Sequence, residues 1–466
     1  MLGAQTTSST PSARWLKQAR ALRDALGAAA VAAAQLRWFA LVAQPRPAGP
    51  EARRWDLEAV NAGSLRGLVW LCADRADADL ARGLAALAVT CFRKLPGLGP
   101  RAQRLGNACL WALGQMPGTD GLAQLAILKT RLKLNATQKL IAAALTAAGE
   151  REGLSPDDLA ERLVPDYGLT DVGARQLSCG DWTAEVLVAG TTEVQVRWRR
   201  ADGRLQAAVP AAVKASHAAE LKALKRSVAD LRQMLPAQRD RLEGLYLARR
   251  QWPYAEWRER YLEHPVVGTL ARRLIWKFSR GDRAASGIWQ AGRIEGREGV
   301  TLDWLDAGTR VELWHPLNVE ADVVLEWRAW LAAHAVRQPF KQAHREVYLL
   351  TDAERATATY SNRFAAHVLR QHQFNALCAT RGWKNQLRLL VDAEYRPAQR
   401  QLPEWGLRAE FWIEGLGQEF GQDTTAAGAY LHVATDQVRF YPLDAHQNWA
   451  HAGGGGYAAG WRQGPA

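Results

Sequence analysis

Apolar side chains recur at helical spacing through the first third of the chain, from Arg14 to about Arg162. One such set is Leu65, Leu68, Val69 and Cys72. Breakers rich in proline and glycine, such as Leu95-Pro96-Gly97, separate the periodic stretches. Helices joined by short connections predict an antiparallel helical array, with HEAT-like pairs, in this part of the chain.

The pattern changes after Pro165. Trp182–Val188 and Val194–Trp198 alternate apolar and polar residues on either side of a Gly190-Thr191-Thr192 turn. Alternation with a period of two around a turn of small residues predicts a β-hairpin.

Two helices are predicted between Ala211 and Gln251, with the break at Pro236. The first carries apolar residues at steps of three and four, namely Leu221, Leu224, Val228, Leu231 and Leu235. Two interpretations are open: a helix that joins a partner in a coiled coil, or one arm of an intramolecular helical hairpin. The spacing covers barely two heptads, which favours the hairpin.

Strands and helices are mixed in the C-terminal part. The expected elements are short strands over Ser286–Pro316, a helix over Val319–His334, a long helix from Asn362 to Arg381, and strands at Leu407–Ile413 and Tyr430–Tyr441. A hairpin turn is expected at Thr435-Asp436.

The predicted fold class is therefore α+β, with an N-terminal helical array, a middle β-hairpin plus helical hairpin, and a mixed C-terminal domain. The predicted domains are a disordered lead-in at 1–13, the helical array at 14–165, the β-hairpin and helices at 166–280, the C-terminal α+β domain at 281–442 and a glycine-rich tail at 443–466.

The chain is basic, with 60 Lys and Arg against 47 Asp and Glu, and a formal net charge of +13. Acidic residues interleave with the basic ones, and no basic tail of the kind that binds nucleic acid is present. Its 20 tryptophans often neighbour arginine, as in Arg197-Trp198-Arg199. Stacking on such rings can hold single-stranded nucleic acid, which is kept as an alternative, although packing in the core is the favoured role.

The five cysteines form no C-x-x-C pair, so neither a disulfide framework nor a zinc site is expected, and a reducing cytoplasm fits best. The longest apolar run, Ala25 to Leu36, is twelve residues long. Spanning a bilayer takes about 20 residues. We therefore expect a cytoplasmic protein without a signal peptide or membrane segment.

The densest set of polar and ionisable side chains lies between Gln338 and Phe374. On the helix expected from Asn362, the side chains of Arg363, His367 and Arg370 would share one face. Guanidinium and imidazole groups that face a Lys-His-Arg-Glu segment could bind a phosphate or carboxylate group. The candidate ligand-binding residues are Lys341, His344, Arg345, Glu346, Tyr360, Asn362, Arg363, His367 and Arg370.

Three interpretations of this set are open: a structural ion-pair network, an anion-binding site, and an acid–base pair made by His344 with Glu346 or by His367. Metal binding is not expected, because His367 and His372 stand five residues apart and diverge around a helix. No phosphate-binding loop, dinucleotide fingerprint or nucleophile elbow occurs in the sequence, so neither a cofactor nor a reaction is indicated.

Several long runs resemble a known bacterial family. They are RQPFKQAHREVYLLTDAE (Arg337 to Glu354), TYSNRFAAHVLRQHQF (Thr359 to Phe374), CFRKLPGLGPRAQRLGNACLWALG (Cys91 to Gly114), VPAAVKASHAAELKALK (Val209 to Lys225) and WPYAEWRERYLEHPVVGTLARRLIW (Trp252 to Trp276). The chain resembles the "domain of unknown function 4132" family. Members of that family are often labelled as related to the molybdate metabolism regulator, and some of them carry a WGR domain. The resemblance covers roughly 60 to 442 and implies no reaction and no catalytic residues.

Two features depart from that family. The chain has no W-G-R motif, and after Pro442 it ends in a glycine-rich tail, as expected of a truncated product. From these observations we expect an uncharacterised regulatory or scaffolding protein that binds a protein partner through the helical array and an anionic ligand near Arg345, Arg363 and Arg370. The alternatives are an enzyme that uses the cluster at 341–372 and a nucleic-acid-binding protein.

Overall fold

The computed structural model describes residues 10–44, 57–95, 99–132, 135–248, 250–388, 394–417, 419–448 and 450–451. The first nine residues of the predicted lead-in, and positions 452–466 of the predicted tail, lie outside this part. The chain forms two compact units. The larger comprises Met1–Glu243, Gln251–Trp314 and Leu325–Gln342, and the smaller comprises Gly244–Arg250, His315–Val324 and Ala343–Ala466.

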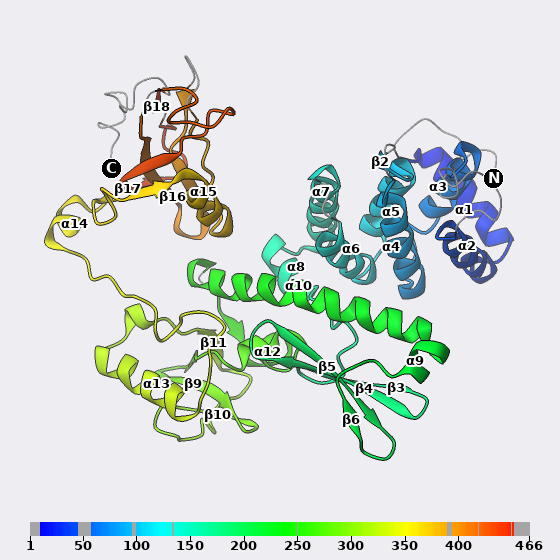
Figure 1. The fold of residues 1–466 in the computed structure, drawn as a ribbon, viewed down its shortest axis with the longest axis horizontal. Coiled ribbons are helices and arrows are strands. Elements are labelled where there is room, and N and C mark those ends of the chain that lie inside the picture. Colours follow the sequence, from blue (N-terminus) through cyan, green and yellow to red (C-terminus); the bar gives the residue numbers. More distant parts are fainter. Residues whose placement is uncertain are drawn as a thin grey trace. The chain divides into compact units, whose positions relative to one another are not determined.

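The N-terminal part of the larger unit is helical, which confirms the prediction from apolar periodicity (Figure 1). Its helices are α1 (Ala13–Ala25), α2 (Ala28–Val42), α3 (Ala59–Trp70), α4 (Ala78–Phe92), α5 (Gln103–Gln115), α6 (Asp120–Arg131), α7 (Asn135–Glu152) and α8 (Pro156–Arg162). Two-residue strands, β1 (Lys94–Leu95) and β2 (Gly99–Pro100), pair between α4 and α5.

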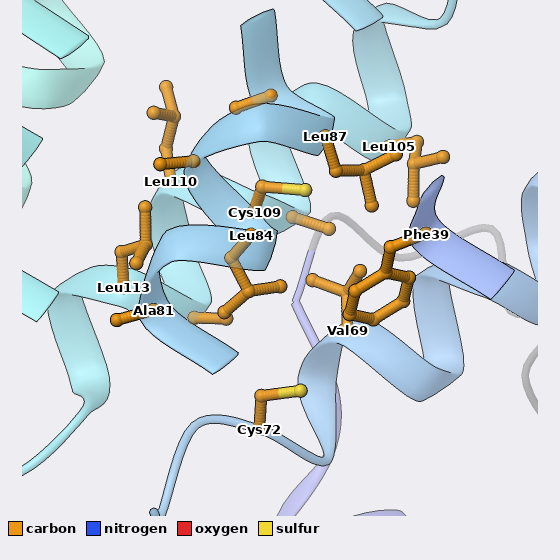
Figure 2. Close-up of a cluster of buried hydrophobic side chains, with 14 of the residues drawn as sticks. Phe39, Val69, Cys72, Ala81, Leu84, Leu87, Leu105, Cys109, Leu110 and Leu113 are labelled. Carbon is orange, nitrogen blue, oxygen red and sulfur yellow. The ribbon is translucent and has the colours of Figure 1, made fainter. Parts of the chain in front are cut away.

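The core of this helical part is built from aliphatic side chains at helical spacing (Figure 2). On α4, Leu80, Leu84 and Leu87 are buried, and Asp77 caps the helix by accepting hydrogen bonds from the amides of Asp79 and Leu80. Such a cap satisfies amides that have no partner inside the helix. The cysteines are buried here as small apolar groups, and burial raises the pKa of Cys72 to about 12.

No single helix among the described residues is long and apolar enough to cross a membrane. The helices α1 and α2 meet the criterion of length and composition only as a pair, and this pair is bent by 105°.

A four-stranded antiparallel sheet follows, with its strands in chain order. Its strands are β3 (Ala174–Cys179), β4 (Trp182–Ala189), β5 (Glu193–Arg200) and β6 (Leu205–Gln206). The predicted hairpin is present, because Val188 pairs with Val194 around Gly190, whose φ of 68° suits glycine.

The predicted break at Pro236 is wrong. Helix α9 (Ala211–Ser216) ends early, and α10 (Ala218–Ala248) continues through Pro236 as one helix of 31 residues. Proline removes one hydrogen bond from a helix interior and usually breaks it. Here Leu231 and Leu235 before the proline and Leu242 after it are all buried, so packing on both sides holds the helix together.

A second, five-stranded antiparallel sheet has the order β10-β9-β8-β11-β7. These strands are β7 (Trp252–Pro253), β8 (Trp276–Arg280), β9 (Arg283–Gln290), β10 (Arg293–Glu295) and β11 (Arg310–Leu313). The helical elements between and after these strands in the chain are α11 (Tyr254–Trp257), a π-helical turn at Arg258–Leu262, α12 (Gly268–Ala271), a 3-10 turn at Pro316–Asn318 and α13 (Ala321–Ala333).

The smaller unit contains a third antiparallel sheet, in the order β12-β17-β16-β15, with β13 also paired to β17. Its strands and helices are α14 (Asp352–Thr357), β12 (Tyr360–Ser361), β13 (Val368–Arg370), α15 (Gln371–Thr380), β15 (Ala398–Leu402), β16 (Leu407–Gly415) and β17 (His432–Pro442), and a separate pair is formed by β14 (Glu394–Tyr395) and β18 (Ala450–His451).

The hairpin turn predicted at Thr435-Asp436 is wrong, because β17 runs through it as a strand of 11 residues. Phe411 pairs with Val438 and Ile413 pairs with Thr435, so β17 uses one residue more than β16 over this step. The turn-like residues therefore lie at a β-bulge, which accommodates an extra residue without ending the strand.

His264 is held as a neutral ring in the larger unit. Its Nδ1 accepts hydrogen bonds from the amides of Val266 and Val267, at 3.1 and 3.2 Å, so its Nε2 donates to the carbonyl of Val164 at 2.9 Å. Burial lowers the pKa of His264 below its ordinary value. Protonation of Nδ1 would remove both acceptor contacts.

The stability of the larger unit is therefore expected to fall as the pH drops from 7.5 to 5.5. In the unfolded state the imidazole of His264 takes up a proton near pH 6.5, whereas in the folded state it does so only at lower pH. The free energy of unfolding therefore decreases by up to about 1.4 kcal/mol for each pH unit between these two pKa values. Thermal unfolding at a series of pH values measures this slope. In His264→Asn, whose side chain keeps an acceptor but does not titrate, the slope should flatten, and an unchanged slope would contradict the assignment.

Candidate functional site

The segment from Gln338 to Leu350, which begins the polar set identified in the sequence, contains no helix or strand. Its buried residue Gln342 has a structural role. The Gln342 side chain accepts from the amide of Ile275 at 2.8 Å and donates to the carbonyls of Ile275 and Trp314, at 2.7 and 3.0 Å. The side-chain amide of Gln342 thus binds main-chain groups next to β8 and β11 in the way that a peptide group of a neighbouring strand would.

Arg345 packs on an aromatic ring in the smaller unit. Its guanidinium carbon lies 4.6 Å from the centre of the Tyr246 ring, and Tyr246 in turn contacts His315 edge to face. Burial, and to a lesser extent the charge of Arg345, lowers the pKa of His315. Lys341, His344 and Glu346 are exposed.

The long helix predicted from Asn362 to Arg381 is wrong over its first half. The structure places β12 at Tyr360–Ser361 and β13 at Val368–Arg370, and α15 begins only at Gln371. Arg363, His367 and Arg370 therefore do not share a helical face.

The departure from a helix has a clear cause. Ala366 adopts a φ of 62°, a left-handed conformation that ends a helix, and its amide donates to the carbonyl of Thr435 at 2.8 Å. The amide of Thr435 donates to the carbonyl of His367 at 2.9 Å. Pairing with β17 thus takes the main-chain groups that a helix would have used.

Arg363 forms an ion pair inside the smaller unit. Its guanidinium donates to Glu354 at 2.7 Å and to the carbonyl of Leu349 at 2.6 Å, and it lies over the Tyr348 ring. Hydrogen bonds from Arg363, and secondly from the hydroxyl of Ser361, hold the pKa of Glu354 well below its usual range. Much of the hydrogen-bonding capacity of Arg363 is therefore already used.

Tyr360 faces a different cation. The guanidinium carbon of Arg439 lies 5.3 Å from the Tyr360 ring centre and 4.1 Å from that of Trp412. Asn362, His367 and Arg370 are exposed. The structure thus distributes the predicted residues among separate contacts, and a ligand role for them stays a prediction.

The third interpretation was an acid–base pair made by His344 with Glu346 or by His367. The structure leaves these three residues exposed to solvent. Among the residues that the structure describes, no group of three or more His, Cys, Asp or Glu side chains could hold a metal ion.

Sequence reasoning missed a cavity of about 490 Å³ in the larger unit. It lies where the β3–β4 turn approaches the end of β6 and helix α9. The polar and aromatic side chains that line it are Asp181, Trp182, Arg200, Gln206, Ser216 and His217, with Cys179 and small residues around them. Binding sites for small molecules typically measure about 300–1,000 Å³. The only sequence signal was Trp182 at the start of the predicted hairpin, because Arg200 lies two residues beyond the predicted strand Val194–Trp198.

Comparisons with known proteins concern part of the chain. "Uncharacterized protein YehI" of Escherichia coli (strain K12) is 28% identical to it over 251 residues, which are 50% of this chain and 20% of that protein. The chain thus spans about a fifth of the length of this relative. No solved structure matches the chain. Residues 203–383 match the model of a family described as "Domain of unknown function (DUF4132)", so the resemblance seen in the sequence is confirmed over that segment.

Proposed function

We propose that this chain is a regulatory or scaffolding protein that binds a protein partner through its first three helices. One observation carries this proposal: large apolar side chains remain exposed there, with exposed fractions between 37% and 73%. These side chains are Leu22, Leu26, Trp38, Leu41 and Val60. Large apolar side chains that are exposed on neighbouring helices can form a surface that another protein covers.

Helix α2 illustrates why this exposure is unusual. Its core-facing residues include Phe39 and Val42, which are buried, whereas Trp38 and Leu41 are exposed beside them. A surface helix normally carries apolar residues on one stripe and polar residues on the other. A second apolar stripe on α2 gives a partner an apolar ridge to bind.

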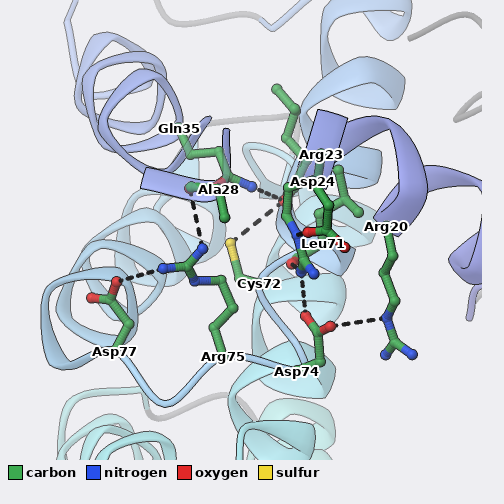
Figure 3. A network of polar contacts seen from close by, with 11 residues as sticks. Arg20, Arg23, Asp24, Ala28, Gln35, Leu71, Cys72, Asp74, Arg75 and Asp77 are labelled. Carbon is green, nitrogen blue, oxygen red and sulfur yellow. Dashed lines mark hydrogen bonds and ion pairs between the residues drawn. The ribbon is translucent and has the colours of Figure 1, made fainter. Parts of the chain in front are cut away.

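This surface belongs to helices that are fixed in place by polar contacts (Figure 3). Asp74, after α3, pairs with Arg20 at 3.1 Å and with Arg23 at 2.7 Å on α1. Arg75 donates to the carbonyl of Ala28 at 3.1 Å, and the buried amide of Gln35 donates to the carbonyl of Leu68 at 2.7 Å. A surface that is already rigid loses little entropy when it binds, which supports docking.

The expected partner element is an amphipathic helix whose apolar face packs on Trp38 and Leu41, because helices recognise apolar ridges and grooves in this way. A photoreactive amino acid at position 41 should crosslink this partner in cells that express the full chain. The crosslinked protein is then purified separately and mixed with the chain, and light scattering after size-exclusion chromatography measures complex formation.

The complex should form with the wild-type chain and be lost with Leu41→Lys. Leu140→Lys is the matched control, since Leu140 is an exposed leucine on α7. Equal complex formation by the two variants would contradict the proposal, as would crosslinking at position 140 that is as efficient as at 41. A link to molybdate regulation is a further proposal that rests on the family resemblance.

A further inference from the structure

We propose that the cavity beside the β3–β4 turn binds a nucleoside monophosphate, with Arg200 holding the phosphate, His217 accepting a hydrogen bond from the ligand and Trp182 stacking on the base. The cavity lies entirely within the larger unit, and neither the family match nor the proposed partner surface assigns a role to it.

Arg200 can supply the main phosphate contact. It is the last residue of β5 and pairs directly across the sheet with Trp182, so the cation and the indole arise from neighbouring strands at the same edge of the cavity. Its side chain contacts Asp202 at 3.5 Å, and both groups are about half exposed. Among the described residues, the other guanidinium N–H groups have no hydrogen-bond acceptor. A guanidinium carries five donors in a planar fork that suits a phosphate.

His217 presents a second nitrogen to the same cavity. The Ser216 hydroxyl donates its proton to the carbonyl of Ala212 at 2.7 Å, so its oxygen accepts from Nδ1 of His217 at 3.1 Å. This arrangement places the Nδ1 proton in that bond and leaves Nε2 for a ligand. In this tautomer Nε2 is an acceptor for an O–H or N–H group of a ligand.

Gly180 lies beside the Cε1–Nε2 edge of the His217 ring, where any side chain would contact the imidazole. A Cβ atom on Gly180 would lie 3.4 Å from Cε1 and 4.0 Å from Nε2 of His217. The φ of Gly180 is 63°, which favours glycine at this turn. The glycine therefore allows a ligand to approach the ring edge.

The remaining lining groups select the rest of the ligand. Trp182 is half-buried and offers an aromatic ring on which a base can stack, as bases stack on aromatic side chains in known complexes. Asp181 is exposed at the same cavity and can accept hydrogen bonds from hydroxyl or amino groups. A bare polyanion would be repelled by this carboxylate, whereas a ligand with one phosphate, a sugar and a base satisfies all three kinds of group.

Isothermal titration calorimetry on the full chain tests the proposal, with AMP and GMP as probes beside adenosine, inorganic phosphate and a short single-stranded oligonucleotide. A monophosphate should bind at least about tenfold more tightly than adenosine or phosphate alone, because both halves of the site contribute. Arg200→Gln should weaken it by about tenfold or more. His217→Ala should weaken binding as well, because it removes the Nε2 acceptor.

Arg199→Gln is the matched control, because Arg199 is the adjacent residue on β5, pairs with Glu185 and does not line the cavity. Thermal unfolding verifies that each variant folds, and Arg200→Lys replaces Arg200→Gln if the latter does not. The proposal is overturned if no nucleotide binds at millimolar concentration, or if the two arginine variants weaken binding equally. Tighter binding of the oligonucleotide than of any monophosphate would also overturn it, in favour of nucleic acid.

Discussion

Replacement of Glu161 with alanine is expected to lower the free energy of unfolding of the larger unit by about 3–5 kcal/mol. Glu161 lies on α8, and its side chain is 1% exposed. It accepts hydrogen bonds from Trp252 Nε1 at 3.1 Å, from the Tyr261 hydroxyl at 2.9 Å and from Arg260 at 3.0 Å. Removal of this carboxylate takes away the acceptor of two buried donors and leaves the partly buried Arg260 with only its ion pair to the exposed Glu256.

The control for this prediction uses the same arginine. Arg260 also pairs with Glu256 at 2.6 Å, but the Glu256 side chain is 43% exposed. Exposed ion pairs contribute about 0–1 kcal/mol, so Glu256→Ala should have a small effect. Urea denaturation followed by circular dichroism compares the two variants. If they destabilise the chain equally, Glu161 does not anchor α8 against the second sheet.

The second large effect is expected for Glu410→Ala in the smaller unit. Arg408 and Glu410 form an ion pair at 3.0 Å on β16, with side chains 0% and 1% exposed. Glu410 also accepts from Trp412 Nε1 at 3.2 Å and from Asn448 at 2.9 Å. Loss of the carboxylate leaves the buried Arg408 charge uncompensated, so the free energy of unfolding should fall by about 3–5 kcal/mol.

A double variant separates this explanation from simple loss of packing. In Arg408→Met combined with Glu410→Leu, neither charge remains, and apolar side chains of similar volume fill the space. Buried ion pairs can be replaced in this way at little cost in other proteins, so the double variant should regain part of the stability lost by Glu410→Ala. Glu404→Ala, an exposed acid on the turn before β16, should be neutral. No recovery in the double variant would contradict the electrostatic explanation.

The helical N-terminal part could be predicted because its apolar period is local. On α4, the residues that repeat in the sequence are the residues that the structure buries, including Leu80, Leu84 and Leu87. The hairpin of β4 and β5 could be predicted equally well, since a glycine turn separates two stretches in which apolar and polar residues alternate. In both cases the signal and the structure depend on neighbours in the sequence.

The errors occurred where distant partners override local preference. Residues 362–370 favour a helix by their own composition, yet main-chain pairing with Thr435 on β17 makes a turn and a short strand. At Pro236 the reverse holds, because buried leucines on both sides keep α10 continuous through a residue that normally ends helices. Neither partner can be identified from the local pattern.

The polar set and the cavity also depend on contacts that the local sequence pattern does not reveal. A row of cations was visible in the sequence, but the pairing of Arg363 with Glu354, nine residues earlier, was not. The cavity beside the β3–β4 turn joins residues between Cys179 and His217 that form no motif. Only the folded sheet brings Trp182 and Arg200 opposite each other.

The central claim, that apolar side chains on α1–α3 bind a protein partner, is tested most directly by the heat-capacity change of binding. Calorimetry with the purified partner at several temperatures measures it. Burial of an apolar surface predicts a clearly negative heat-capacity change, which should shrink in Trp38→Ser and stay unchanged in Leu140→Ser. A heat-capacity change near zero, together with an affinity that falls steeply with salt, would show that charges rather than this apolar surface make the contact.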